Sequence, residues 1–308
     1  MKKKVLVIGG TGFIGTNLLI KLIKNGYNVF ATTTDLKKKK NIKGVKYIKL
    51  NFYNKKNLNQ IKRPFNFIVN LSGYIDHRTY FKGGNHVIKN HLFSFFKIIN
   101  SISKKELIKF IQIGSSDEYG NNKSPQSEKS REDAISPYSF SKISITHFLQ
   151  MLSKTEKFPC VILRFFLVFG PHQKSNRLIP YIIKNFLLNK KISVSKNNIK
   201  KDFCYVDNIC DAIIASFKIK KNGAIYNVGS GRGVSIKFLL KKIIKIQKKN
   251  NNHLINFNMN QTKIENKNLY PQTKNFFQET KWKPKISLEN GLKKTIKFYQ
   301  DILVKKSK

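Results

Sequence analysis

The sequence predicts an α/β fold in which a doubly wound parallel sheet is followed by a smaller C-terminal lobe. Short apolar runs alternate with helical patterns, as expected for βα units whose strands are buried on both faces. A glycine-rich turn joins the first apolar run to the first helical pattern. Beyond residue 166 the composition shifts. We therefore expect one unit over 1–166, with 203–235 returning to it, and a second lobe over 167–202 and 236–308.

The expected strands are short apolar segments bounded by polar residues or glycine. They cover 5–8, 27–33, 45–50, 67–71, 110–113, 161–166 and 224–229, with shorter extended pieces at 192–195 and 202–207. Helical spacing of apolar residues follows the first glycine turn and recurs after Ser136 and near the C-terminus. The segment from Val87 to Ser103 is apolar nearly all round, which predicts a helix that is deeply buried or lies at a subunit interface.

The glycine-rich turn spans 9–15. Gly9 permits a tight turn, Gly12 removes the Cβ that would keep a diphosphate from the backbone, and Gly15 permits close packing of the helix on the strand. The free N–H groups at the start of that helix favour an anion. The spacing is G-x-x-G-x-x-G rather than G-x-G-x-x-G, so a tight turn without a ligand is the alternative. We expect a Rossmann-like dinucleotide site.

The preference between NAD and NADP depends on the end of the strand over 27–33. In NAD-selective sites an acidic residue there holds the adenosine ribose hydroxyls. Here Thr33 occupies the position, and Asp35 precedes the lysines at 37–40. A ribose 2′-phosphate would meet little repulsion at this position. The sequence is therefore compatible with NAD or NADP and modestly favours NADP. The alternative is that these lysines lie in a solvated loop and do not contact a cofactor.

Other strand ends carry residues suited to a ligand cleft, because parallel sheets bind ligands at their carboxyl edge. Ser72 follows the fourth strand and, with the glycine after it, lets the backbone run close to a cofactor. The fifth strand ends in G-S-S-D-E-Y-G, and we expect the hydroxyls and acids of 115–118 to face the cleft, among them Ser116 and Asp117.

A Tyr-x-x-x-Lys pair opens the helix that follows Pro137. Tyr138 and Lys142 are four residues apart, so both side chains point from one helix face. A nearby ammonium and the positive charge of an oxidised nicotinamide favour the phenolate form. This suits Tyr138 to exchange a proton with a sugar hydroxyl while the nicotinamide exchanges hydride. Ser115 is placed to hydrogen-bond the same substrate oxygen. The alternative is an ordinary surface pair on an amphipathic helix.

Composition restricts the class of protein. The formal net charge is +44, but only six of the 60 basic residues are arginine and the lysines are scattered, so we favour compositional bias over a specific nucleic-acid surface. The absence of a long apolar run predicts no membrane span and a cytoplasmic location. Three cysteines without C-x-x-C spacing predict buried free thiols and no metal site.

Six motifs in order, GGTGFIG, SSDEYG, SPYSFSK, RFFLVFGP, KDFCYVDNI and WKPKISLENGL, resemble the extended short-chain dehydrogenase/reductase family of NAD-dependent epimerases and dehydratases that act on nucleotide sugars. The resemblance implies a Rossmann domain over 1–166 and a substrate-binding lobe. It implies a catalytic triad of Ser115, Tyr138 and Lys142, and a homodimer paired through the helices around 92–102 and 143–152. The cofactor would be held by Gly9, Gly12, Phe13, Ile14, Gly15, Thr33, Ser72, Asn90, Tyr138 and Lys142, and the nucleoside diphosphate sugar by Ser116, Asp117, Arg177 and Lys201 or Asp202.

The motifs leave the reaction subtype open. Dehydratases place an Asp-Glu pair directly after the catalytic hydroxyl residue, whereas here the acids come one place later, at Asp117 and Glu118. We therefore expect an epimerase or 4-keto reductase that acts at C4 of the sugar. A sugar-nucleotide 4,6-dehydratase, or a non-catalytic relative that binds dinucleotide or RNA, is the alternative.

Overall fold

The structure is a computed structural model that describes residues 2–37, 41–195, 199–248, 251–258 and 267–306. Within these residues, seven parallel strands form one large sheet in the order β3-β2-β1-β4-β5-β6-β10. The strands are β1 (Lys4–Ile8), β2 (Asn28–Thr33), β3 (Val45–Lys49), β4 (Phe67–Asn70), β5 (Lys109–Ser115), β6 (Cys160–Phe165) and β10 (Ala224–Val228). This order reverses between β1 and β4, which confirms the predicted doubly wound Rossmann-like sheet.

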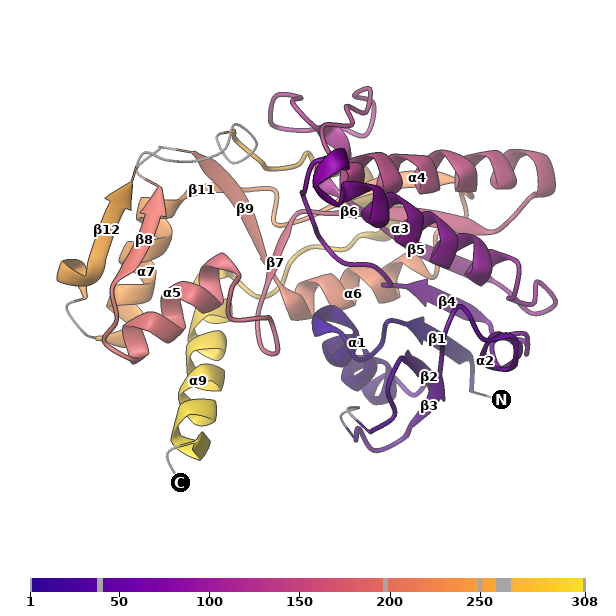
Figure 1. Ribbon diagram of the computed structural model, residues 1–308, viewed down its shortest axis with the longest axis horizontal. Helices are drawn as coiled ribbons and strands as arrows, with labels where there is room; N and C mark the ends of the chain where they lie inside the picture. Colours follow the sequence, from indigo (N-terminus) through magenta and orange to yellow (C-terminus); the bar gives the residue numbers. More distant parts are fainter. Residues whose placement is uncertain (1, 38–40, 196–198, 249–250, 259–266, 307–308) are drawn as a thin grey trace.

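Helices cover both faces of the large sheet (Figure 1). The elements are α1 (Phe13–Lys24) and α6 (Val206–Ser216) on one face, α3 (Gly84–Ile99) and α4 (Pro137–Glu156) on the other, and the short α2 (Lys55–Asn59) between β3 and β4. The side chains of strand β1 show why both faces of the sheet are covered by helices. Val5 and Val7 pack into the hydrophobic core under α1 and α6, while Leu6 and Ile8 pack into the core under α3 and α4. Both faces of β1 are therefore buried, as its continuous apolar sequence requires.

Helix α3 is buried on one side only. Val87, Phe95 and Ile98 are buried against the sheet and α4. Phe96 lies on the outer side and keeps 38 % of its surface exposed. The helix thus has a face towards the core and an apolar outer face.

The second lobe lies beside the large sheet, with β7 and β9 between the two parts (Figure 1). Its elements are α5 (Leu178–Leu187), α7 (Ile236–Gln247) and α9 (Leu288–Lys306), a parallel pair of β8 (Ile192–Ser195) with β12 (Ile255–Asn258), and a small sheet of β7 (Leu167–Phe169), β9 (Lys200–Tyr205) and β11 (Gly233–Ser235). Helix α8 (Lys274–Thr280) packs instead against β10 of the large sheet. Single 3₁₀ turns form η1 (Tyr80–Lys82), η2 (Ser116–Tyr119) and η3 (Asn252–Leu254).

The segment over 203–235 divides between the two sheets. Strand β10 joins the edge of the large sheet beside β6, and α6 packs against α1. Strand β11 instead pairs antiparallel with β9 in the small sheet. The extended piece expected over 202–207 ends at Tyr205, because Val206 already begins α6.

The three cysteines, Cys160, Cys204 and Cys210, are buried and unpaired, as the sequence predicts. In the described part of the chain, every helix is too short or too polar to cross a membrane.

Candidate active site

The glycine turn forms an open anion cradle at the carboxyl end of β1. Gly9 has a φ of +78°, and its backbone N–H donates to the Thr32 hydroxyl at 3.0 Å. Gly12 is the N-cap of α1 and has no side chain to cap the helix, and the first turn of α1 carries no acidic residue. The free N–H groups and the positive end of the helix dipole are therefore left for a negatively charged ligand.

The cradle fits a dinucleotide diphosphate, because Gly12 leaves space open for a ligand whereas Gly15 packs tightly within the protein. A Cβ added at Gly15 would lie 2.5 Å from the carbonyl oxygen of Gly9, so this glycine permits tight packing within the protein. A Cβ added at Gly12 would contact only that same oxygen, at 3.3 Å, and otherwise projects into open space. Phe13 and Ile14 follow directly and are half-buried at the start of α1.

Thr33 ends β2 beside this cradle and is nearly buried. Its hydroxyl accepts a hydrogen bond from the Asp35 backbone N–H at 3.2 Å and donates to the Asp35 carbonyl at 2.9 Å. The Asp35 carboxylate accepts from the Lys37 backbone N–H at 2.8 Å, which keeps the turn compact. The lysines at 38–40 lie outside the described residues.

Ser72 is fixed by a chain of amides at the end of β4. Its hydroxyl donates to Oδ1 of Asn70 at 2.6 Å, and the Asn70 side chain donates to Gln112 at 2.9 Å. Asn90 is exposed on α3, and its amide donates to the Tyr74 hydroxyl at 3.3 Å. The structure thus places Ser72 at the sheet edge and Asn90 against the loop that follows β4.

Ser115 ends β5 and is held by a buried carboxylate. The Ser115 backbone N–H donates to Oε1 of Glu118 at 2.8 Å, and the Ser115 hydroxyl accepts from the Asp117 backbone N–H at 3.1 Å. Oε2 of Glu118 lies 2.8 Å from Nη2 of Arg164, a fully buried arginine on β6. The expectation that Glu118 faces the cleft is therefore wrong, because its carboxylate is wholly buried and neutralises Arg164.

Arg164 is a supporting residue that the sequence analysis missed, and Glu118 is its buried partner. Arg164 interrupts the apolar strand CVILRF and lies opposite Gly114 in the sheet. It also bonds Glu132 at 2.6 Å, and its partner Glu118 accepts from Thr146 at 2.9 Å. A charge within a buried strand requires a buried partner, and this signal could have identified the pair.

Tyr138 and Lys142 meet Ser115 at the first turns of α4. Ser136 caps the helix by accepting from the Ser139 backbone N–H at 3.1 Å, and Pro137 follows at the first helical position. Tyr138 is 5 % exposed and forms a side-chain hydrogen bond with Ser115. Nζ of Lys142 lies 5.8 Å from the centre of the Tyr138 ring. The fold therefore brings the three predicted catalytic residues together.

Burial dominates the electrostatics of this triad. It raises the pKa of the Tyr138 phenol, and the nearby Asp117 carboxylate raises it further, while the hydrogen bond with Ser115 acts in the opposite direction. Burial also lowers the pKa of the Lys142 ammonium to about 8.

The expectation that the Lys142 ammonium favours a Tyr138 phenolate is therefore corrected. Burial acts more strongly on the phenol than any nearby charge. Nζ of Lys142 donates to the Ile113 carbonyl at 2.8 Å, so the ammonium is directed to the end of β5. In the absence of bound NAD, burial therefore favours the protonated form of Tyr138.

Two histidines flank the Tyr138 ring. The His91 ring centre lies 5.5 Å away and the His77 ring centre 5.9 Å away, both edge to face. Nε2 of His77 also lies 2.9 Å from Oδ2 of Asp117. The sequence analysis did not select His77, because no local spacing relates a loop residue after β4 to an acid after β5.

A small pocket opens beside Tyr138 at the carboxyl edge of the large sheet. It is lined by His77, Ser116, Asp117, Ser136, Lys201 and Lys267, among others. Ser116, Asp117 and Lys201 are thus brought together as predicted substrate residues. Arg177 is exposed at the N-cap of α5, and its charge acts on both His77 and Tyr138.

Asp202 does not face this pocket, which corrects its expected placement beside the substrate. It is wholly buried, and burial raises the pKa of its carboxyl to about 6. The carboxylate accepts from the backbone N–H groups of Ser230 at 2.9 Å and Arg232 at 3.1 Å, and from the Ser230 hydroxyl at 2.9 Å. Asp202 therefore fixes the loop between β10 and β11.

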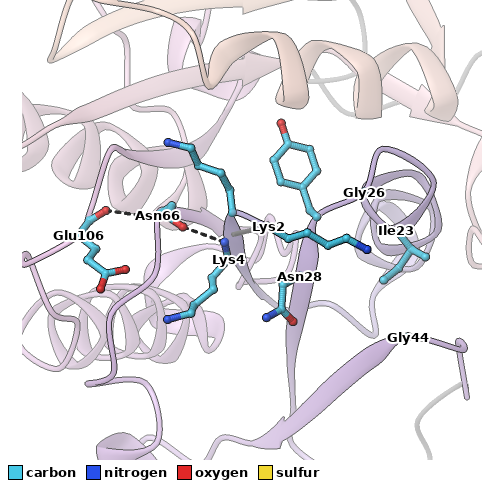
Figure 2. A pocket seen from close by; sticks show the side chains of 10 residues that line it. Lys2, Lys4, Ile23, Gly26, Asn28, Gly44, Asn66 and Glu106 are labelled. Carbon is cyan, nitrogen blue, oxygen red and sulfur yellow. Dashed lines mark hydrogen bonds between the residues drawn. The ribbon is translucent and has the colours of Figure 1, made fainter.

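A larger cavity, of about 860 Å³, lies at the opposite edge of the sheet, where β1 and β2 begin (Figure 2). Lys4, Asn28 and Glu106 are among its lining residues. The Lys4 backbone N–H donates to the Asn66 side chain at 2.8 Å, and that amide donates to the Glu106 carbonyl at 3.4 Å. These contacts tie β1 to the segments around it, far from the strand ends that carry the predicted catalytic triad.

Comparison with known proteins agrees with this geometry. The human dTDP-D-glucose 4,6-dehydratase is 28 % identical to the chain and aligns with 97 % of it and 90 % of the human protein. The UDP-glucose 4-epimerase of Thermotoga maritima superposes with a TM-score of 0.88 at 22 % identity, covering 97 % of this chain and 99 % of that one. The Bacillus cereus UDP-glucuronic acid 4-epimerase, solved with UDP-glucuronic acid and NAD, has a TM-score of 0.85 at 24 % identity and covers 97 % and 99 %.

The model of the NAD dependent epimerase/dehydratase family matches residues 5–229. This range contains the glycine cradle, the Ser115 turn and the Tyr138 helix. The chain belongs to the NAD dependent epimerase/dehydratase family.

Proposed function

We propose that this protein is an NAD-dependent enzyme that acts at C4 of a nucleoside diphosphate sugar. It is either an epimerase that oxidises C4 and returns the hydride, or a reductase that transfers hydride to a 4-keto sugar. The meeting of Ser115, Tyr138 and Lys142 at the strand ends next to the glycine cradle carries the proposal. Family membership supports the cofactor and the substrate class.

Each residue of the triad has a role that follows from its contacts. During oxidation at C4, Tyr138 would accept the hydroxyl proton as the phenolate, which the positive charge of an oxidised nicotinamide favours, and its raised pKa suits it to return that proton on reduction. Ser115 donates a hydrogen bond to the same oxygen, where negative charge develops. Lys142 binds the nicotinamide ribose and keeps a positive charge near Tyr138. When bound, NAD supplies the acceptor for the C4 hydride.

We infer that NAD is the cofactor. The Bacillus cereus relative is solved with NAD, and the family is defined by NAD dependence. Thr33 offers no carboxylate to repel a 2′-phosphate, so some use of NADP remains compatible with the end of β2.

We also propose a homodimer formed through α3 and α4. These helices pack against each other and carry large apolar side chains on their outer side. Phe96, Phe140 and Met151 are 38 %, 46 % and 42 % exposed. Replacing Phe96 and Met151 with lysine is expected to give a monomer by light scattering, and an unchanged mass would contradict this interface.

The proposed reaction is tested by product analysis. The protein is incubated with NAD and, separately, with dTDP-glucose, UDP-glucose, UDP-N-acetylglucosamine, UDP-glucuronic acid, CDP-glucose or GDP-mannose, and each sugar nucleotide is recovered for NMR. A C4 epimer or a 4-keto sugar supports the proposal. A full set of unchanged substrates, with no reduced nicotinamide formed, contradicts it.

A further inference from the structure

The cavity of about 860 Å³ at the amino edge of the large sheet carries a concentrated positive charge (Figure 2). Three consecutive lysines, Lys2, Lys3 and Lys4, line it at the start of β1, and the described residues around it include one acid, Glu106. Small-molecule sites in proteins have volumes of roughly 300 to 1,000 Å³, so the cavity is large enough for a ligand. Its charge favours an anion.

The ammonium groups of these lysines are available to a ligand. In the described part of the chain, none of the three forms an ion pair, although Glu106 lines the same cavity. The backbone that carries them is fixed. The Asn28 N–H donates to the Lys3 carbonyl at 3.0 Å, and the Asn66 N–H donates to the Lys4 carbonyl at 3.0 Å. The site of charge is therefore built into the start of the sheet.

Other residues of the lining add an apolar surface and an amide. Ile23 and Tyr27 lie near the end of α1 and are half-buried. The Tyr27 ring is held edge to face by Phe67 and Phe217, with ring centres 6.1 and 5.8 Å away. Within the described structure the Asn28 side chain forms no hydrogen bond, so its amide can bond a ligand. The cavity thus combines cations, an apolar surface and a free amide.

The C-terminal end of α1 borders the cavity, and its dipole alone would disfavour an anion. The last carbonyls of this helix are already hydrogen-bonded, however. The Leu22 carbonyl accepts from the Tyr27 N–H at 3.2 Å. The Ile23 carbonyl accepts from the Gly26 N–H at 2.9 Å. Lys24 adds a positive charge in the last turn, so the helix end does not cancel the charge of the three lysines.

We propose that this cavity is a second nucleotide site, which binds a nucleoside polyphosphate. The three lysines bind the phosphate groups, the base packs on Ile23 and Tyr27, and the Asn28 amide bonds the edge of the base. Phosphate alone would leave the apolar surface unused, and an apolar molecule would leave the lysines unused. The site lies at the opposite edge of the sheet from the glycine cradle and does not depend on the proposed function.

A general attraction of polyanions is the explanation that the test must exclude, because lysine is abundant throughout this chain. Such attraction depends on net charge and weakens with salt, whereas a site depends on where particular charges lie. Helix α7 offers the matched control. Lys237, Lys241 and Lys245 are exposed, lie four residues apart on one helix face and line neither cavity described above. Lys237→Gln, Lys241→Gln and Lys245→Gln together form the α7 triple variant.

The test measures affinity for ATP, GTP, CTP and UTP by calorimetric titration of the full-length protein with NAD in excess. The buffer contains about 0.15 M salt, which screens exposed charges beyond ~8 Å. The cavity triple variant combines Lys2→Gln, Lys3→Gln and Lys4→Gln. We expect its affinity for the tightest of these nucleotides to fall at least ~10-fold, and that of the α7 triple variant to fall less than ~2-fold. Inorganic triphosphate, which lacks the base, is expected to bind the wild type at least ~5-fold more weakly.

Glu106→Gln provides a change of the opposite sign. It removes the acid from the lining and leaves the lysines in place, so we expect nucleotide affinity to rise about 2- to 5-fold. Asp301→Asn is its control, because Asp301 is exposed on α9 and outside both cavities. We expect wild-type affinity in Asp301→Asn. Thermal unfolding of every variant shows that it is folded.

NMR of protein containing glycine labelled with ¹⁵N locates the bound nucleotide. Gly26 lines the cavity with a φ of +78°, and Gly26→Asn identifies its signal because asparagine tolerates this conformation. We expect the Gly26 signal to shift as nucleotide is added. An unmoved signal, equal losses of affinity in the two triple variants, or inorganic triphosphate that binds as tightly as every nucleotide overturns the site. Displacement of the nucleotide by a lower concentration of an RNA oligonucleotide overturns it as well.

Discussion

The Ser115 backbone N–H donates a hydrogen bond to Oε1 of Glu118, 2.8 Å away, so a wholly buried carboxylate holds the end of β5 at the centre of the candidate active site. The other oxygen of that carboxylate pairs with Arg164. The position of the Ser115 hydroxyl is therefore linked to an ion pair that is wholly buried.

Arg164→Met is expected to lower the free energy of unfolding by about 3 to 5 kcal/mol, because it leaves the Glu118 carboxylate buried without its cation. The double variant with Glu118→Gln is expected to regain part of that loss. Urea unfolding of the wild type, both single variants and the double variant gives the coupling energy. Strictly additive losses, or a loss below about 1 kcal/mol in Arg164→Met, would show that the pair does not hold this region.

Alanine substitutions at two glycines of the cradle are expected to have different effects on NAD affinity and on stability. Gly12→Ala projects a methyl group into the proposed diphosphate site and contacts only the Gly9 carbonyl within the protein, at 3.3 Å. We expect NAD affinity to fall at least ~10-fold while thermal stability stays close to that of the wild type.

Gly15→Ala is the matched control, because its Cβ would lie 2.5 Å from the Gly9 oxygen. Overpacking of this kind is expected to cost about 1 to 3 kcal/mol of stability. Calorimetric titration with NAD and thermal unfolding measure the two effects. Equal losses of affinity and stability in Gly12→Ala would refute an open phosphate cradle.

His91 is expected to make the protein less stable in mild acid. Its pKa is about 4 in the folded protein and near 6.5 when unfolded, so the unfolded chain binds the proton first as pH falls. The resulting loss begins near pH 6.5, continues down to about pH 4, and amounts to about 2 kcal/mol by pH 5. Urea unfolding at about pH 7 and pH 5 is compared between the wild type and His91→Gln. The same pH dependence in both proteins would exclude His91 as its source.

Thr33→Asp is expected to sharpen the preference for NAD. The new carboxylate lies where ribose hydroxyls bind and repels a 2′-phosphate, so the ratio of NAD to NADP affinity should rise at least ~10-fold. Thr33→Ser, which keeps a hydroxyl able to bond Asp35, is the control. Binding of both dinucleotides is measured for each protein. A ratio that does not change in Thr33→Asp would place the adenosine ribose elsewhere.

The parts of this protein that could be predicted from sequence are those set by local spacing. Continuous apolar runs gave the parallel strands, and the four-residue spacing of Tyr138 and Lys142 put both on one helix face. Gly9 and Gly12 were predicted because few other residues suit a tight turn that must remain open to a ligand.

The parts that could not be predicted depend on contacts between distant segments. In the tight 3₁₀ turn of η2, Asp117 faces the pocket and Glu118 faces the core. Glu118 faces the core because its carboxylate pairs with Arg164 on the neighbouring strand. Asp202 is similarly turned away from the pocket by the loop at Ser230. The pairing of His77 with Asp117 spans 40 residues, and only the fold brings the two together.

The most direct test of the central claim, that Tyr138 transfers the proton at C4, is a comparison of the wild type with Tyr138→Phe. The initial rate of reduced nicotinamide formation on addition of an active sugar nucleotide is measured alongside NAD affinity. We expect the rate to fall at least ~100-fold with NAD affinity within ~3-fold of the wild type, because the phenol hydroxyl is lost while the ring stays in place. Full turnover in Tyr138→Phe would contradict the mechanism.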